Sequence, residues 1–166
     1  MLKKMIALLV LSLGVAPLVA ATNTDSSQPT ASQQQGSMQQ ASSVHWYTNY
    51  NQAAAQAQKE KKPLLLFFTG TDWCGWCKKM DQEIFSSPDF AKAAGNEFVF
   101  VELDYPMNKK LPQDEAQQNA SLKQKFGITG YPTVVILDPN GNFIAESGYR
   151  PGGGKAYADY LKQLVQ

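Results

Sequence analysis

Two cysteines three residues apart, Cys74 and Cys77, are the residues whose types and spacing point most directly to chemistry. They are the only cysteines in the 166 residues and stand in the sequence Cys-Gly-Trp-Cys. At helical spacing, residues i and i+3 have Cα atoms about 5 Å apart, which is within the range that a disulfide bridges. Both the oxidised and the reduced form should therefore be accessible without dismantling the fold.

The position of the two cysteines predicts different roles for them. Cys74 is expected at the N-terminus of a helix, where free backbone N–H groups and the positive end of the helix dipole stabilise a thiolate and lower its pKa. It should be the attacking cysteine. Cys77 lies one turn further on, on the apolar face, and should resolve a mixed disulfide formed through Cys74.

Three other interpretations of the pair compete with a redox role. A structural disulfide closing a four-residue loop would add little chain-entropy stabilisation. A closed zinc site needs two further ligands, but the chain has no third cysteine and only one histidine, His45. A two-thiolate copper(I) site stays open, although nothing else in the sequence favours it.

The elements around the cysteines must hold them in place. The apolar run 64–68 predicts a central strand buried on both faces, followed by a helix that begins near Cys74 and carries Cys77, Met80 and Ile84 on one face. Further elements are expected as a helix over 49–62, a short helical segment over 87–95, a strand over 98–103, a helix over 114–126, two strands over 133–137 and 142–147, and a helix over 154–165. This order predicts an α/β fold with a central mixed sheet flanked by helices.

Composition divides the chain into three parts. Residues 1–21 have a basic start, an apolar stretch and a small-residue end, Val19-Ala20-Ala21, which is typical of a cleaved signal peptide; an uncleaved anchor is the alternative. Residues 22–43 are rich in Gln, Ser and Thr and predict a flexible linker. Residues 44–166 should form the single folded domain, with no stable membrane insertion after cleavage.

The charge balance argues against binding to nucleic acid that is driven by positive charge. Lys and Arg number 15 against 14 Asp and Glu, so the chain lacks the positive surplus that concentrates proteins on nucleic acid.

Two segments resemble a known family. Trp73-Cys74-Gly75-Trp76-Cys77 after an apolar strand, and Gly130-Tyr131-Pro132-Thr133 before another, resemble the active-site motif and cis-proline loop of thioredoxin-fold proteins. The early Trp46 and the lead-in segment 68–73 are most similar to exported thioredoxin-like oxidoreductases of the DsbH type. The resemblance covers residues 44–166 and implies a thioredoxin-like fold.

The resemblance also implies a substrate site. Pro132 would be cis and lie beside Cys74, with the backbone at Tyr131 pairing with an extended substrate segment. Trp73, Gly75 and Trp76 would complete the surface around the reactive sulfur. The redox group would be the Cys74–Cys77 disulfide itself, with no bound organic cofactor and no metal.

One residue departs from the family pattern. Thioredoxins carry a buried acid on the strand before the motif, and the matching position here is Phe67, with no acid between Pro63 and Thr71. Cys77 must then lose its proton to water, to Asp72, or to a group that folding brings close. Without such a group, resolution should be slower and more pH-dependent than in thioredoxin.

The function expected from these features is that of a periplasmic or otherwise secreted thiol-disulfide oxidoreductase acting as a reductase. The alternatives are a disulfide-forming oxidase or isomerase, or a chaperone-like module that binds extended chains. Its partners would be cysteine-containing exported proteins and an unidentified redox partner, with a membrane electron donor as one candidate. We expect a monomer, because 123 residues leave no room for a separate dimerisation domain.

Overall fold

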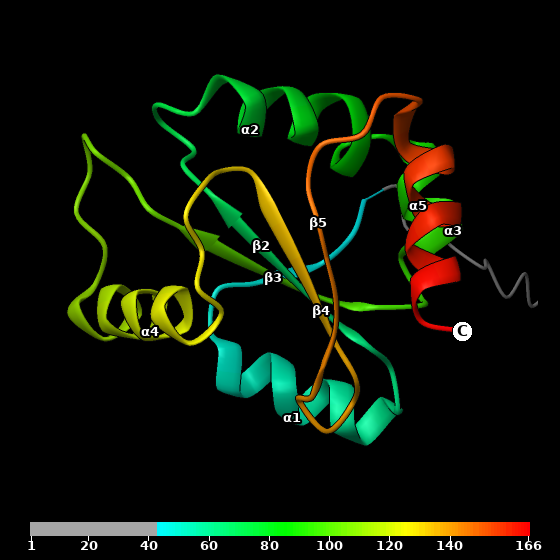
Figure 1. Ribbon diagram of the computed structural model, residues 1–166, viewed down its shortest axis with the longest axis horizontal. Helices are drawn as coiled ribbons and strands as arrows, with labels where there is room; N and C mark the ends of the chain where they lie inside the picture. Colours follow the sequence, from blue (N-terminus) through cyan, green and yellow to red (C-terminus); the bar gives the residue numbers. More distant parts are fainter. Residues whose placement is uncertain (1–42) are drawn as a thin grey trace, which may run out of the picture. The chain divides into compact units, whose positions relative to one another are not determined.

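A five-stranded mixed sheet forms the centre of the computed structural model, which describes residues 43–166 (Figure 1). The strand order is β1-β3-β2-β4-β5, with β2 parallel to β3 and antiparallel to β4. The strands are β1 (Trp46–Tyr47), β2 (Leu64–Thr69), β3 (Val99–Asp104), β4 (Thr133–Leu137) and β5 (Phe143–Ser147). The predicted signal peptide, and the predicted linker except for its last residue, lie outside the described residues.

Helices cover both faces of the sheet (Figure 1). They are α1 (Tyr50–Glu60), α2 (Gly75–Met80), α3 (Pro88–Ala94), α4 (Gln113–Lys125) and α5 (Gly153–Leu164). One apolar core joins α2, α3 and α5 to the first face, and a second core joins α1 and α4 to the other. The predicted α/β fold with a mixed, helix-flanked sheet is confirmed.

Strand β2 holds the two cores together. All six of its residues are buried, and its side chains alternate between the two cores. Leu65 and Phe67 belong to the core that contains Cys74 and Cys77, whereas Leu64, Leu66 and Phe68 belong to the other. The continuous apolar run in the sequence is therefore explained by burial on both faces.

The helix after the cysteines differs from the expected continuous α-helix. Helix α2 ends at Met80, and residues Asp81–Phe85 form a π-helical turn, η1. The N–H of Ser86 accordingly donates to the carbonyl of Asp81, five residues back. The wider turn explains why the neighbours Ile84 and Phe85 are both buried, which a narrow apolar stripe on an α-helix does not predict.

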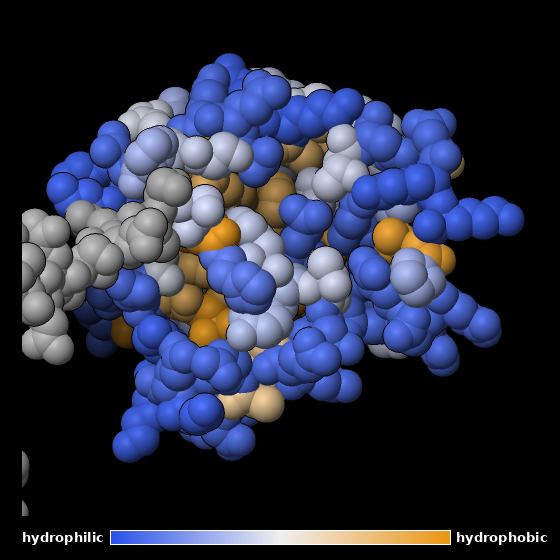
Figure 2. Space-filling model, turned by 180° about the vertical axis from the view of Figure 1, so that it is seen from behind, coloured by the Kyte–Doolittle hydropathy of each residue, from blue (hydrophilic) through white to orange (hydrophobic). Residues whose placement is uncertain are grey.

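The back face of the molecule is mainly polar. Figure 2 shows hydrophilic side chains over most of this face, with apolar side chains gathered near its centre. Within residues 43–166, none of the helices has the length and apolar character needed to cross a membrane.

Helices α3 and α5 pack so closely that only glycine fits at one contact. A Cβ at Gly154 would overlap Ser87 Oγ and lie 2.9 Å from the backbone nitrogen of Phe90. Ser87 Oγ is also the cap of α3, accepting the N–H of Phe90 at 3.1 Å. A side chain at position 154 must therefore displace this cap.

We predict that Gly154→Ala lowers the free energy of unfolding by about 2–4 kcal/mol, through overpacking and loss of the α3 cap. Urea denaturation followed by circular dichroism measures the change. Gly130→Ala is the matched control, because a Cβ there meets no atom within 4 Å. An equal effect of the two substitutions would contradict this account of the helix contact.

Candidate active site

Cys74 and Cys77 form a disulfide at the junction of β2 and α2, with Cα atoms 5.2 Å apart. Cys74 is the N-cap residue of α2, and its Sγ accepts the backbone N–H of Cys77 at 3.2 Å. The exposed fraction is 6% for Cys74 and 1% for Cys77. Cys74 is therefore the more accessible cysteine, and its Sγ lies against a backbone donor that can stabilise negative charge.

A tight turn connects β2 to the disulfide. The backbone N–H groups of Trp73 and Cys74 both donate to the carbonyl of Gly70, at 3.3 and 2.8 Å. A Cβ at Gly70 would lie 2.6 Å from the indole nitrogen of Trp73, so glycine is needed for the ring to lie against the turn. The same indole N–H donates to the carbonyl of Tyr105 at 2.8 Å, which fixes the ring.

Asp104, at the end of β3, anchors this turn from below. Its buried carboxylate accepts the backbone N–H and the hydroxyl of Thr71, at 2.9 and 2.8 Å. Lys109 Nζ lies 2.8 Å from the same carboxylate, and this hydrogen bond raises the pKa of Lys109. Asp104 was not among the residues predicted from the sequence; its place at the end of a buried apolar strand is visible there, but its partner Thr71 is not.

Asp72 ties the turn to the segment after β3. Its carboxylate accepts the backbone N–H groups of Met107 and Asn108, at 3.1 and 2.6 Å. Desolvation alone would raise the pKa of Asp72, but these two donors outweigh it and the pKa is lowered. Asp72 is therefore a structural hydrogen-bond acceptor and a poor base.

The proline loop lies beside the same turn. The Tyr131–Pro132 peptide bond is cis, and β4 begins at Thr133, directly opposite Phe68 near the end of β2. The ring of Tyr131 meets that of Trp73 edge to face, with centroids 5.6 Å apart. Register and aromatic contact together bring the loop before β4 against the loop that leads to Cys74.

A second aromatic pair lies on the other side, on α2. Trp76 is 59% exposed, and its ring centroid is 5.4 Å from that of Tyr149, in the segment between β5 and α5. The Tyr149 hydroxyl donates to Glu83 at 2.6 Å, and this bond raises its pKa. Lys79 Nζ lies 5.4 and 5.5 Å from the two ring centroids. Tyr149 was not among the residues predicted from the sequence.

Gly75 lies in the chain between Trp73 and Trp76, the tryptophans of the two aromatic pairs, and the space beside it is open. A Cβ added to it would meet no atom within 4 Å. Trp73, Gly75, Trp76 and Tyr131 thus come from segments that the fold gathers around the disulfide, and all but Gly75 contribute aromatic rings to its surroundings.

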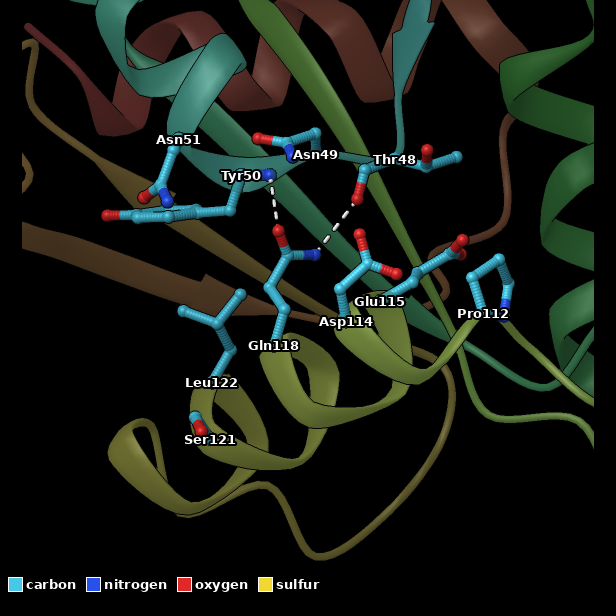
Figure 3. A pocket seen from close by; sticks show the side chains of 10 residues that line it. All are labelled: Thr48, Asn49, Tyr50, Asn51, Pro112, Asp114, Glu115, Gln118, Ser121 and Leu122. Atoms are coloured by element: carbon cyan, nitrogen blue, oxygen red, sulfur yellow. Dashed lines mark hydrogen bonds between the residues drawn. The ribbon is translucent and has the colours of Figure 1, made fainter.

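One hollow of the described residues lies away from the disulfide. A pocket of about 420 Å³ opens between the start of α1 and α4 (Figure 3), where the Gln118 side chain bridges the N–H of Tyr50 and the carbonyl of Thr48. None of the residues that line it belongs to the loops around the disulfide. Among the described residues, no cluster of three or more His, Cys, Asp or Glu side chains could hold a metal ion.

Comparison with known proteins gives one consistent result. The family model of the thioredoxin-like domain matches residues 50–164. A Chlamydia pneumoniae protein named disulfide bond reductase DsbH is 37% identical over 126 residues, which are 76% of this chain and 75% of that protein. The thioredoxin-related protein DsbJ of the same organism is 34% identical over 164 residues, 98% of this chain but only 43% of the relative's length.

A solved structure agrees with these matches. The structure described as DsbH oxidoreductase superposes with a TM-score of 0.72 at 34% identity, covering 88% of this chain and 94% of that one.

The anchoring role of Asp104 generates a prediction. Asp104→Ala should lower the free energy of unfolding of the oxidised protein by about 3 kcal/mol, because it leaves both Thr71 donors without their buried acceptor. Lys109→Met should cost about 1 kcal/mol or less, because the Lys109 side chain is 54% exposed. Chemical denaturation of the two variants checks the difference, and equal losses would show that the ion pair, and not the Thr71 bonds, dominates.

Proposed function

The chain belongs to the thioredoxin-like family, and from that premise we propose that it is an exported reductase of protein disulfides. It is a thiol-disulfide oxidoreductase of the DsbH type with a disulfide between Cys74 and Cys77. The observation that carries the proposal is the placement of this disulfide at the start of α2, with Cys74 as the more accessible cysteine.

The reaction runs through a mixed disulfide. The Cys74 thiolate attacks one sulfur of a substrate disulfide, and the other substrate sulfur leaves as a thiolate. The Cys77 thiolate then attacks Cys74 Sγ, which releases the second substrate sulfur and forms the Cys74–Cys77 disulfide. A redox partner returns two electrons and two protons to restore the dithiol. The N–H of Cys77, which contacts Cys74 Sγ, supports Cys74 as the attacking group.

Substrate would bind across the open side of the disulfide. We assign this contact to Trp73, Gly75, Trp76, Tyr131 and Pro132, with the backbone at Tyr131 pairing with an extended substrate segment. The exposed Trp76 and the partly exposed Trp73 offer apolar surface to such a segment. The free space around Gly75 lets a polypeptide approach the sulfur.

The proposed direction of electron transfer and the proposed location of the protein are supported by different observations. The relative named disulfide bond reductase favours reduction over oxidation or isomerisation. The signal-like pattern of residues 1–21 supports export to the periplasm or beyond, and residues 22–43 would then link that segment to the domain 44–166. The partners would be exported proteins that contain cysteines and a redox partner, for which a membrane electron donor is a candidate.

We predict that Cys77→Ser accumulates mixed disulfides with partner proteins, because Cys74 can still attack but nothing resolves the product. Non-reducing gel electrophoresis followed by mass spectrometry of the adducts measures this. Cys74→Ser is the matched control and should form none. Equal trapping by both variants would contradict the assigned roles.

The reductase direction predicts a reduction potential of about −270 mV, the thioredoxin value. Equilibration in dithiothreitol buffers, followed by the fluorescence of Trp73 and Trp76, gives this potential. A value of about −120 mV would identify a disulfide donor and overturn the proposed direction.

A further inference from the structure

Resolution of the mixed disulfide needs a proton acceptor for the Cys77 thiol. Cys77 is 1% exposed, so bulk water has little access to it. Phe67, which lies in the same core as Cys77, occupies the position on β2 where thioredoxins carry a buried acid, and its ring cannot take a proton. Asp72 is engaged by two backbone N–H groups that lower its pKa, so it is a poor base. The acceptor must come from another element.

Glu102 on β3 lies in the right place. The parallel register pairs Phe67 with Glu102, so both side chains leave the sheet on the same face. Phe100, two residues before Glu102, lies with Phe67 in the core that contains Cys77. Neighbouring strands are about 4.8 Å apart, so Glu102 lies one strand away from Phe67, on the face of the sheet that packs against α2.

The Glu102 side chain is half-buried in an otherwise buried strand, and its carboxylate makes no hydrogen bond or ion pair within residues 43–166. The other acid on this face of β3, Asp104, is occupied by Thr71 and Lys109. Glu102 is therefore the acid on this face with free capacity to accept a proton.

The charges that face Glu102 come from several elements. They are Asp104 at the end of β3, Asp81 on η1, Lys109 after β3 and Glu115 on α4. Desolvation raises the pKa of Glu102, Asp104 and Asp81 raise it further, and Lys109 opposes them. Asp81 is the C-cap residue of α2, four residues after Cys77. A raised pKa makes the group a better proton acceptor near neutral pH.

We propose that the Glu102 carboxylate accepts the proton of the Cys77 thiol, directly or through one water, when the mixed disulfide is resolved. The Cys77 S–H bond breaks and its proton moves to Glu102, while the thiolate attacks Cys74 Sγ. The Cys74–Cys77 bond forms, the bond to the substrate sulfur breaks, and that sulfur leaves with the electron pair and is protonated by Glu102 or by solvent. The inference rests on the proposed exchange at this pair but holds for either direction, because in reverse Glu102 returns the proton to Cys77.

The test separates attack from resolution. The reduced full-length chain is mixed with oxidised glutathione, quenched with acid, and analysed by mass spectrometry between pH 5.5 and 9. Formation of the Cys74 adduct depends on glutathione concentration, whereas its conversion to the Cys74–Cys77 disulfide does not. We expect Glu102→Gln to slow the second step on the order of 10²-fold near neutral pH. The remaining rate should rise about tenfold per pH unit with the thiolate fraction of Cys77.

Matched variants identify the cause. Glu97→Gln removes the same charge from an exposed position before β3 and should leave both steps unchanged. Glu102→Asp should recover most of the rate. Unfolding of Glu102→Gln, followed by circular dichroism, should show stability at pH 7 no lower than that of the natural chain, because a half-buried charge is removed.

Two results would overturn the assignment. One is a Glu102→Gln variant that resolves the adduct with the rate and pH profile of the natural chain. The other is a loss of rate in Asp81→Asn with no loss in Glu102→Gln, which would assign the proton to η1. Failure of the proposed function itself looks different: the natural chain would then form no adduct at Cys74.

Discussion

The burial of β2 on both faces is the constraint on which the active site depends. Six consecutive buried residues fix this strand between two cores. Its carboxyl end continues directly into the turn Gly70–Trp73. Because β3 runs parallel and β4 antiparallel to it, the end of β3 and the start of β4 meet at the same edge. Strand direction thereby brings Asp104 and the cis-Pro132 loop to the end of β2 from which the chain continues to Cys74, and register and the Trp73–Tyr131 contact set their positions there.

Much of this arrangement could be predicted from the sequence, because the signals are local. The apolar run before Cys-Gly-Trp-Cys and the helix after it each depend on a few adjacent residues, whereas the position of the Tyr131–Pro132 loop beside them was expected only from the family resemblance. Asp104, Tyr149 and Glu102 could not be assigned in this way, since their roles depend on strand register and on contacts between segments 30 to 70 residues apart. The π-helical turn was also missed, because an apolar periodicity does not distinguish a four-residue from a five-residue hydrogen bond.

Three acids near the disulfide show how environment decides role. Asp104 and Asp72 have hydrogen-bond donors for their oxygens and serve to hold the turn. Glu102 has none among the described residues, and burial raises its pKa. A folded-state pKa above the unfolded value contributes most to stability at low pH, and that contribution is lost as pH rises through the folded pKa. Glu102 thus lowers stability at neutral pH, which is the expected sign for a group kept for proton transfer.

The position of Glu102 on β3 explains how the site manages without an acid on β2. An acid at Phe67 would lie between β3 and β4 and would replace a ring that packs 4.9 Å from Phe85 and 6.0 Å from Trp46. On its other side, β3 pairs with only two residues of β1, opposite Phe100 and Val101, so the ladder ends before Glu102. The carboxylate therefore stays half-buried and keeps partial access to water, through which a proton taken from Cys77 can leave. Moving the acid by one strand preserves the aromatic core and still places a base on the face of the sheet that packs against α2.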